Sequence, residues 1–134
     1  MISNLAVDTH ALVWYLLKSA RISATALGSM EDVLRNGGVI HVPSVCLVEV
    51  IYLAEKQRLP WSAWERLREY LDRPDSGLDL VPLDRGIAEA LRRVPREHVP
   101  DMPDRIIAAT AFHLGVPLVT RDESIRASGI ETIW

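Results

Sequence analysis

Four carboxylates in this chain lie in apolar stretches, where an ionised side chain is out of place. They are Asp8, Glu49, Asp104 and Asp122. A charged carboxylate in such surroundings is costly unless it is paired, hydrogen-bonded or bound to a metal ion. Four such residues spread along one chain are explained together by one divalent-cation site. Oxygen ligands without histidines or a cysteine at ligand spacing suit Mg²⁺ or Mn²⁺ rather than zinc.

Glu49 is the carboxylate that a purely structural role explains least well. It lies in an apolar helical stretch, and no basic residue follows it until Lys56. Residues three and four positions away are neighbours on a helix. Those of Glu49 are all apolar or aromatic: Val45, Cys46, Tyr52 and Leu53. A metal or active-site role is therefore favoured over a lone neutral carboxyl group or a pair with a distant arginine.

The aspartates each have an alternative interpretation as helix-terminal residues. Asp8 and Asp122 precede expected helices, and Asp is a favoured N-cap, although Thr9 could cap the first helix instead. If Asp101 caps a later helix, Asp104 lies at its third position, where an acid complements the helix dipole. Asp101 is itself a fifth candidate for the site, as a cap first and a contributor to metal binding second.

Length and composition predict one domain over residues 1–134. The chain is long enough to bury a core without disulfides, and its 49% hydrophobic content is ordinary for a globular protein. No apolar run is long enough for a membrane span, and the first residues lack the pattern of a signal peptide. One cysteine, Cys46, cannot form an internal disulfide. These features predict a cytoplasmic protein.

The net charge of −3 argues against a protein that binds nucleic acid through bulk charge alone. It is compatible with a nuclease that holds acids in one pocket and arginines at the rim, because bound cations reverse the sign of such a pocket. Arg105 and Arg121 flank two of the acids. They are candidates for phosphate contact, although simple balance of the acidic neighbour is the favoured interpretation.

Short β-rich runs alternate with helical periods along the whole chain. Strands are expected at 5–7, 39–42, 78–81, 118–120 and 131–133. Helices are expected at 11–17, 23–36, 43–56, 62–71, 85–94, 101–114 and 122–127. Ser23 is the expected cap of the second helix, and residues 62–65 have the spacing of a capping box.

This alternation predicts an α/β fold with a mostly parallel sheet covered on both faces. In such sheets the active site lies outside the carboxyl ends of the strands. Asp8 and Asp122 both fall at or just after the end of an expected strand. The pattern therefore places these two acids at the functional edge, and His10, two residues after Asp8, is expected nearby.

The ordered set of motifs resembles the PIN domain family, and most closely the VapC-like toxin ribonucleases of bacterial and archaeal toxin–antitoxin pairs. The resemblance extends from Asp8 to Trp134. Its pieces are Val-Asp8-Thr9-His10-Ala-Leu, the mid-helix Glu49, Pro103-Asp104-Arg105-Ile-Ile-Ala-Ala-Thr-Ala and Leu-Val-Thr120-Arg121-Asp122. One departure is Asp101-Met-Pro-Asp104, whose proline stands one position later than in the common Asp-Pro-x-Asp form.

The resemblance implies a three-layer α/β/α sandwich and a Mg²⁺- or Mn²⁺-dependent endoribonuclease acting on RNA. It also implies a homodimer that is inhibited by a cognate antitoxin protein. Thr120 matches a hydroxyl residue that would orient a metal-binding carboxylate without contacting the metal itself. Thr9 is a further candidate for this role. By motif position, the catalytic and metal-binding acids would be Asp8, Glu49, Asp104 and Asp122.

Aromatic residues mark a possible second surface. Trp14 and Tyr15 lie on the first expected helix, and Trp61 and Trp64 lie at the start of the fourth. The default interpretation is that they belong to the core. The alternative is a groove for the antitoxin, because Trp and Tyr are favoured anchors of protein interfaces.

Other functions fit the residues less well. An aspartate-nucleophile phosphatase wants a second acid two residues after the first, where this chain has His10. A response-regulator receiver needs an early acidic pair and a late lysine, but the lysines are Lys18 and Lys56. A catalytically silent PIN-like module that binds RNA or a partner is the remaining alternative. The four acids disfavour it, because a silent site has no use for uncompensated buried charge.

Overall fold

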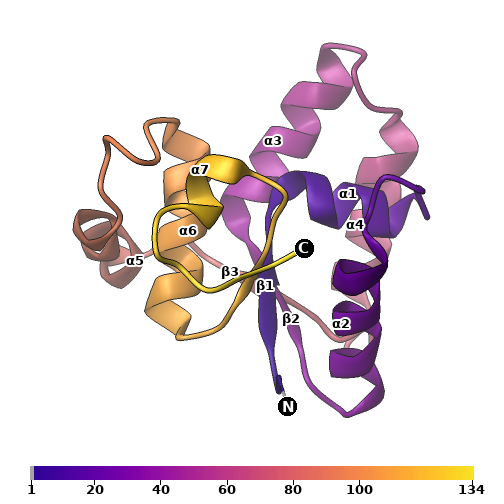
Figure 1. Cartoon of the computed structure of the whole chain (residues 1–134). Helices are drawn as coiled ribbons and strands as arrows, with labels where there is room; N and C mark the ends of the chain where they lie inside the picture. The colour runs from indigo at the N-terminus through magenta and orange to yellow at the C-terminus, as the bar shows by residue number, and fades with distance from the viewer. Residues whose placement is uncertain (1) are drawn as a thin grey trace.

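A computed structural model describes residues 2–134 of the chain (Figure 1). Five parallel strands form one sheet in the order β3-β2-β1-β4-β5. The strands are β1 (Leu5–Val7), β2 (Ile40–Pro43), β3 (Leu78–Val81), β4 (Leu118–Val119) and β5 (Thr132–Ile133). Seven α-helices and a 3₁₀ helix connect them: α1 (Thr9–Leu16), α2 (Ala24–Arg35), α3 (Ser44–Glu55), α4 (Trp61–Asp72), α5 (Arg85–Ala90), η1 (Leu91–Arg93), α6 (Met102–Leu114) and α7 (Glu123–Arg126).

The strand order divides the chain around β1. The chain moves from β1 through β2 to β3 on one side, then crosses to β4 and β5 on the other. Right-handed crossovers therefore send the two sets of connecting helices to opposite faces of the sheet. Figure 1 shows α2 and α4 on one side and α5 and α6 on the other, and α6 contacts β1. The predicted α/β/α sandwich is confirmed.

The central strand β1 is buried on both faces, and all three of its residues are apolar. Its neighbours in the sheet, β2 and β4, are also mostly buried, whereas the edge strand β3 is not. Cys46 lies in the core as expected, and burial raises the pKa of its thiol. The core therefore holds β1 rigidly, together with the residue that follows it.

The predicted N-cap residues begin four of the helices. The Ser23 hydroxyl accepts a hydrogen bond from the Ala26 amide at 3.0 Å and caps α2. Gly115 ends α6 with φ 68, in the left-handed region that favours glycine. Gly38 is required for a steric reason, because a Cβ there would lie 1.9 Å from the carbonyl oxygen of Ser3.

Several helix boundaries differ from prediction, and two of the differences have a clear local cause. The capping box expected at residues 62–65 is wrong, because α4 begins at Trp61 with Pro60 as N-cap. The Pro60 carbonyl already accepts from the Ala63 amide at 3.0 Å, which places Ser62 inside the first turn. The helix expected over 85–94 is α-helical only to Ala90 and continues as a 3₁₀ turn. Pro95 prevents any further continuation.

The aromatic residues divide between core and surface. Trp14 is buried, Tyr15 and Trp64 are partly buried against the core, and Trp61 is 49% exposed. The default core interpretation is therefore wrong for Trp61. Within residues 2–134, no helix is both long and apolar enough to cross a membrane.

Candidate active site

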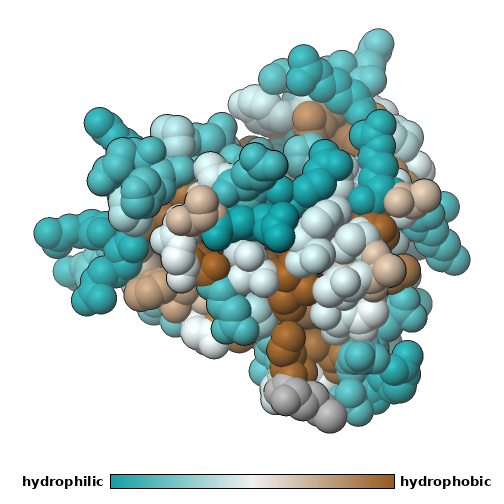
Figure 2. Space-filling view, viewed as in Figure 1, coloured by the Kyte–Doolittle hydropathy of each residue, from teal (hydrophilic) through white to brown (hydrophobic). Residues whose placement is uncertain are grey.

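The carboxyl ends of β1 and β4 meet at the point where the strand order reverses, the usual place for a ligand in an α/β sheet. Asp8 follows β1, and its backbone amide donates to the Val119 carbonyl of β4 at 3.1 Å. Hydrophilic side chains gather above this edge, between α7 and α1 (Figure 2). An acidic pocket of about 260 Å³ lies here, lined by Asp8, His10, Trp14, Asp104, Arg121 and Asp122.

Asp8 is held by hydrogen bonds to both carboxylate oxygens. Oδ1 accepts from the Ala11 amide at 2.8 Å, which caps α1, and Oδ2 accepts from the Thr120 hydroxyl at 2.6 Å. The residue is only 8% exposed. Burial raises its pKa above the ordinary value, although both hydrogen bonds act in the opposite direction. The cap and site interpretations of Asp8 are thus compatible.

Thr120 connects the two strand-end acids. Its side chain is fully buried, donates to Asp8, and accepts from the backbone amide of Asp122 at 3.0 Å. One hydroxyl therefore fixes both the carboxylate after β1 and the backbone after β4. Thr120 can therefore orient a ligand-binding carboxylate by a hydrogen bond, without contacting the ligand itself.

Asp122 is stabilised in its ionised form. Burial alone raises its pKa, but hydrogen bonds from the Ser124 hydroxyl and from the amides of Ile125 and Ser124 outweigh this effect. The pKa therefore lies below its ordinary value. Asp122 is also the N-cap of α7, as its position had suggested.

Asp104 behaves differently from its neighbours. Asp101 caps α6, and its Oδ1 accepts from the Asp104 amide at 3.1 Å, which leaves the Asp104 carboxylate in the pocket. Burial, together with repulsion from nearby acids, raises the pKa of Asp104 to about 7. Those acids are Asp101, Asp122, Glu49 and Asp8. Carboxylates from distant parts of the chain thus share one electrostatic site.

Glu49 lies beside the acidic pocket and is not among its lining residues. It is half-buried. Its Oε1 accepts from the Thr9 hydroxyl at 2.5 Å, and Thr9 is the residue after Asp8. The hydrogen bond aligns α3 with the start of α1. Glu49 is close enough to raise the pKa of Asp104.

One wall of the acidic pocket is aromatic and cationic. The guanidinium carbon of Arg121 lies 4.7 Å from the centre of the Trp14 ring, a cation–π contact. The His10 ring lies 5.6 Å from Trp14, and Trp134 packs on Trp14 at 5.8 Å. Sequence analysis missed Trp14 as a pocket residue. Its spacing of four from His10 would have placed both on one helix face.

Arg105 has a structural role that neither sequence interpretation contained. Its Nε donates to the Val94 carbonyl and its Nη2 to the Leu91 carbonyl, both at 2.8 Å. The side chain therefore fastens the end of η1 to α6. Among residues 2–134 it forms no ion pair with Asp104. The expectation that it balances its acidic neighbour is wrong.

The donor set of the acidic pocket fits a hard divalent cation. Asp8, Asp104 and Asp122 supply only oxygen ligands, and a bound cation would relieve the repulsion that raises the pKa of Asp104. Within the described part of the chain, no three His, Cys, Asp or Glu side chains already have the arrangement of a metal centre. Mg²⁺ keeps several waters and needs few direct protein ligands.

Comparison with known proteins finds relatives that match nearly the whole chain. The chain is 25% identical to Ribonuclease VapC22 of Mycobacterium tuberculosis, over 93% of this chain and 92% of that protein. Two solved complexes share its fold. VapBC2 from Rickettsia felis, bound to a promoter DNA fragment, has a TM-score of 0.72 and 16% identity, with 96% of each chain covered. A toxin–antitoxin complex from Klebsiella pneumoniae has a TM-score of 0.69 and 23% identity, with 97% and 96% covered.

The family comparison covers the same region as the sheet and its acidic edge. The PIN domain family profile matches residues 5–129, from the start of β1 to just beyond α7. The match includes every acid assigned to the candidate site. With this match, the parallel sheet and the acids after β1 and β4, the chain belongs to the PIN domain family.

Proposed function

We propose that this protein is a metal-dependent endoribonuclease that acts as the toxin of a toxin–antitoxin pair. The observation that carries the proposal is the convergence of Asp8, Asp104 and Asp122 on one pocket, with the pKa of Asp104 raised to about 7. A site that gathers like charges in this way is suited to holding a cation. The ribonuclease relative supports RNA as the substrate.

The acids have distinct roles in this proposal. Asp8, Asp104 and Asp122 would hold Mg²⁺ or Mn²⁺, and Glu49 would be the fourth acid, held in place by Thr9. When bound, the cation supplies Lewis-acid chemistry at a phosphate oxygen and lowers the pKa of the attacking water. Thr120 keeps the Asp8 carboxylate in position through its 2.6 Å hydrogen bond.

Arg121 and the aromatic wall are suited to the substrate side of the acidic pocket. The Arg121 guanidinium is exposed and stacked on Trp14, and it forms no ion pair within residues 2–134. We assign it to a phosphate of the RNA, because a guanidinium offers several N–H donors in a fixed plane. His10 on the same wall is exposed and can contact the adjoining nucleotide.

The solved relatives support a partnered protein. The neighbours from Rickettsia felis and Klebsiella pneumoniae are VapBC and toxin–antitoxin complexes. We extend this to the present chain as a cytoplasmic, single-domain homodimer that a cognate antitoxin inhibits. The exposed Trp61 is available for such a partner.

The proposal is tested by cleavage of a labelled RNA pool with Mn²⁺, with Mg²⁺ and with EDTA. We expect cleavage that requires metal and is lost in Asp8→Asn, because removing one charge from the metal site weakens the site while leaving the α1 cap oxygen in place. Asp32→Asn is the matched control, an exposed acid on α2 outside the pocket.

Each outcome of the cleavage assay has a definite meaning. Equal cleavage by the parent protein and Asp8→Asn identifies a contaminating nuclease and removes the support for the proposal. If no preparation cleaves and Mn²⁺ does not bind, the protein is a silent PIN-like binding module. Metal binding without cleavage of the pool indicates a selective nuclease, and cleavage of transfer, ribosomal and messenger RNA is then compared.

A further inference from the structure

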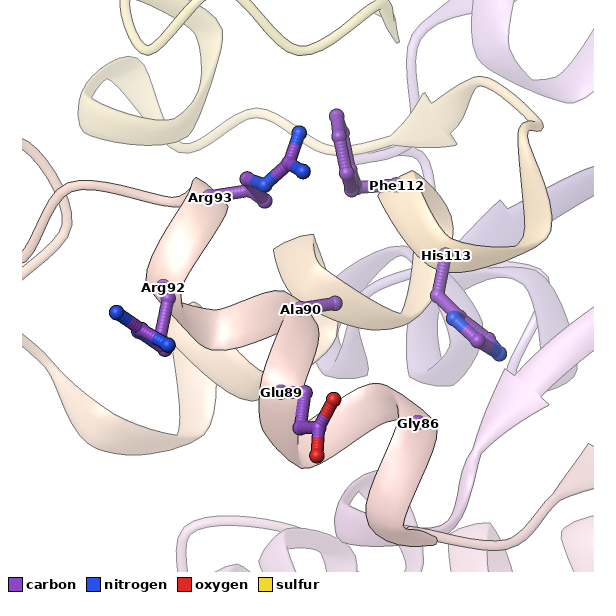
Figure 3. Close-up of a pocket in the computed structure, with 7 residues that line it drawn as sticks. All are labelled: Gly86, Glu89, Ala90, Arg92, Arg93, Phe112 and His113. Carbon is purple, nitrogen blue, oxygen red and sulfur yellow. The ribbon is translucent and has the colours of Figure 1, made fainter.

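A second cavity lies outside the acidic pocket, between the α5–η1 segment and α6. It encloses about 690 Å³. Arg92 and Arg93 line it from η1, Phe112 and His113 from α6, and Glu89 from α5 (Figure 3). None of these residues lines the acidic pocket. We propose that this cavity, the arginine cleft, binds the RNA strand a few nucleotides from the bond that is cut. The inference rests on the proposed ribonuclease function.

The charge of the arginine cleft is suited to phosphate. Residues 91–96 contain three arginines and no acid, in a chain whose net charge is −3. Arg92 and Arg93 are exposed and form no ion pair among the described residues. The one acid in the cleft, Glu89, already accepts from Arg85 at 3.2 Å. Two guanidinium groups are therefore available for a polyanion.

The aromatic member of the cleft favours RNA over other polyanions. Phe112 is 46% exposed, whereas its neighbour Ala111 is fully buried. In Figure 3, Arg93 extends from η1 toward Phe112 at one end of the cleft. An exposed ring beside guanidinium groups provides stacking for an unpaired base and ionic contact for its phosphate. An acidic peptide would use the arginines and leave the ring without a partner.

The cleft also has room for a polar contact from His113. A Cβ at position 86 would lie 2.8 Å from the His113 Cε1 atom. Gly86 therefore leaves the space that the imidazole occupies at the edge of the cleft. A ring N–H in this position adds a hydrogen-bond donor for phosphate or base.

The arginine cleft and the acidic pocket share helix α6. Asp104 stands near its first turn and Phe112 near its last, eight residues later. At about 1.5 Å per residue, the two positions are separated by about 12 Å along the helix. A few nucleotides of single-stranded RNA cover this distance. One strand can thus have a phosphate at the acids and a base at Phe112.

The test is the affinity of the protein for a fluorescent single-stranded RNA of about twelve nucleotides, in the Asp8→Asn background to prevent cleavage. Arg92→Gln with Arg93→Gln is compared with Arg35→Gln with Arg68→Gln. The control pair removes the same charge from exposed ion pairs on α2 and α4.

We expect the cleft pair to weaken binding about tenfold and to reduce the slope of log affinity against log salt by about 1 to 2. Phe112→Ser should weaken binding about tenfold with the salt slope unchanged, because it removes stacking and no charge. The control pair should stay within about twofold of the parent protein. This pattern would support an RNA site in the cleft.

The opposite results separate the two proposals. Equal affinity and salt slope for the cleft pair and the control pair would overturn the cleft site. So would loss of a dimer on sedimentation of the cleft variants, which would assign the cleft to a second copy of this chain. Cleavage of a trinucleotide by protein with Asp8 intact would keep the ribonuclease proposal. If that protein neither binds nor cleaves RNA, both proposals fail.

Discussion

At the scale of single residues, hydroxyl groups prepare the acids for a ligand. Thr120 donates to Asp8 and Thr9 donates to Glu49, so two threonines fix two carboxylates. Neither of these acids forms an ion pair in the part of the chain that the structure describes. Hydrogen bonds hold both carboxylates in place without a paired basic residue, which leaves the site ready for a cation.

Asp104 should make stability depend on pH. Its pKa is about 7 in the folded protein against 3.8 for the unfolded reference. Between these values the folded state binds more protons, so stability falls as pH rises through this window. Asp104→Asn removes the effect. With EDTA, the variant should melt several degrees above the parent protein at about pH 8 and close to it at about pH 4. A lower melting temperature of the variant at about pH 8 would contradict the raised pKa.

Thr120→Val should impair the site more than the fold. The substitution keeps the shape of the buried side chain and removes the hydroxyl that serves both Asp8 and the Asp122 amide. We expect Mn²⁺ affinity to fall at least about tenfold and stability to fall by about 2 kcal/mol. Calorimetric Mn²⁺ titration and urea unfolding measure the two effects. Thr120→Ser should restore most of the affinity, and failure to do so would exclude the hydroxyl as the cause.

At the scale of elements, caps and site residues coincide. Asp8, Asp101 and Asp122 each accept a backbone N–H at the start of a helix. Helix N-termini carry partial positive charge. Three helices therefore begin at the acidic edge of the sheet, where their dipoles favour the ionised form of the acids.

Arg105 should matter for the packing of η1 on α6. Arg105→Met removes the guanidinium donor from the carbonyls of Leu91 and Val94, of which the Leu91 carbonyl keeps its bond from the Val94 amide. We expect a loss of about 2 kcal/mol in unfolding free energy, because hydrogen bonds from charged groups are strong. Arg85→Gln is the control, since its ion pair with Glu89 is largely exposed and should contribute less than about 0.5 kcal/mol. Urea denaturation measures both losses of unfolding free energy. Equal losses would show that the carbonyl contacts stabilise the protein no more than an exposed ion pair does.

At the scale of the whole molecule, the acidic pocket joins segments from both ends of the chain. Asp8 is near the N-terminus and Asp122 near the C-terminus, while Asp104 begins α6. Trp134 packs on Trp14 behind the pocket. A ligand at this site therefore binds only the folded chain, which couples metal binding to global stability.

Mn²⁺ should raise the melting temperature. At a concentration ten times the dissociation constant, binding to the folded state contributes about 1.4 kcal/mol, which corresponds to about 5 °C for a chain of this size. Thermal melts with Mn²⁺ and with EDTA measure the shift. Asp32→Asn should keep it and Asp8→Asn should lose it. An equal shift in both variants would place the bound metal elsewhere on the protein.

The sequence by itself determined the secondary structure and the functional edge. Short stretches of sequence suffice to predict strands and helices, because periodicity, caps and glycine stops are local properties. A parallel sheet then put Asp8 and Asp122 at the carboxyl ends of their strands. The predicted capping box at residues 62–65 is wrong, because the helix already begins at Trp61, with Pro60 as its N-cap.

Only the tertiary structure decided which groups meet. The Thr9–Glu49 hydrogen bond joins residues 40 positions apart, and the Thr120–Asp8 bond joins residues 112 positions apart. Arg105 donates to the carbonyls of Val94 and Leu91, contacts that the sequence did not predict. The pKa of Asp104 depends on burial and on charges brought from other segments. Such contacts depend on strand order and on packing across the sheet, which no local pattern specifies.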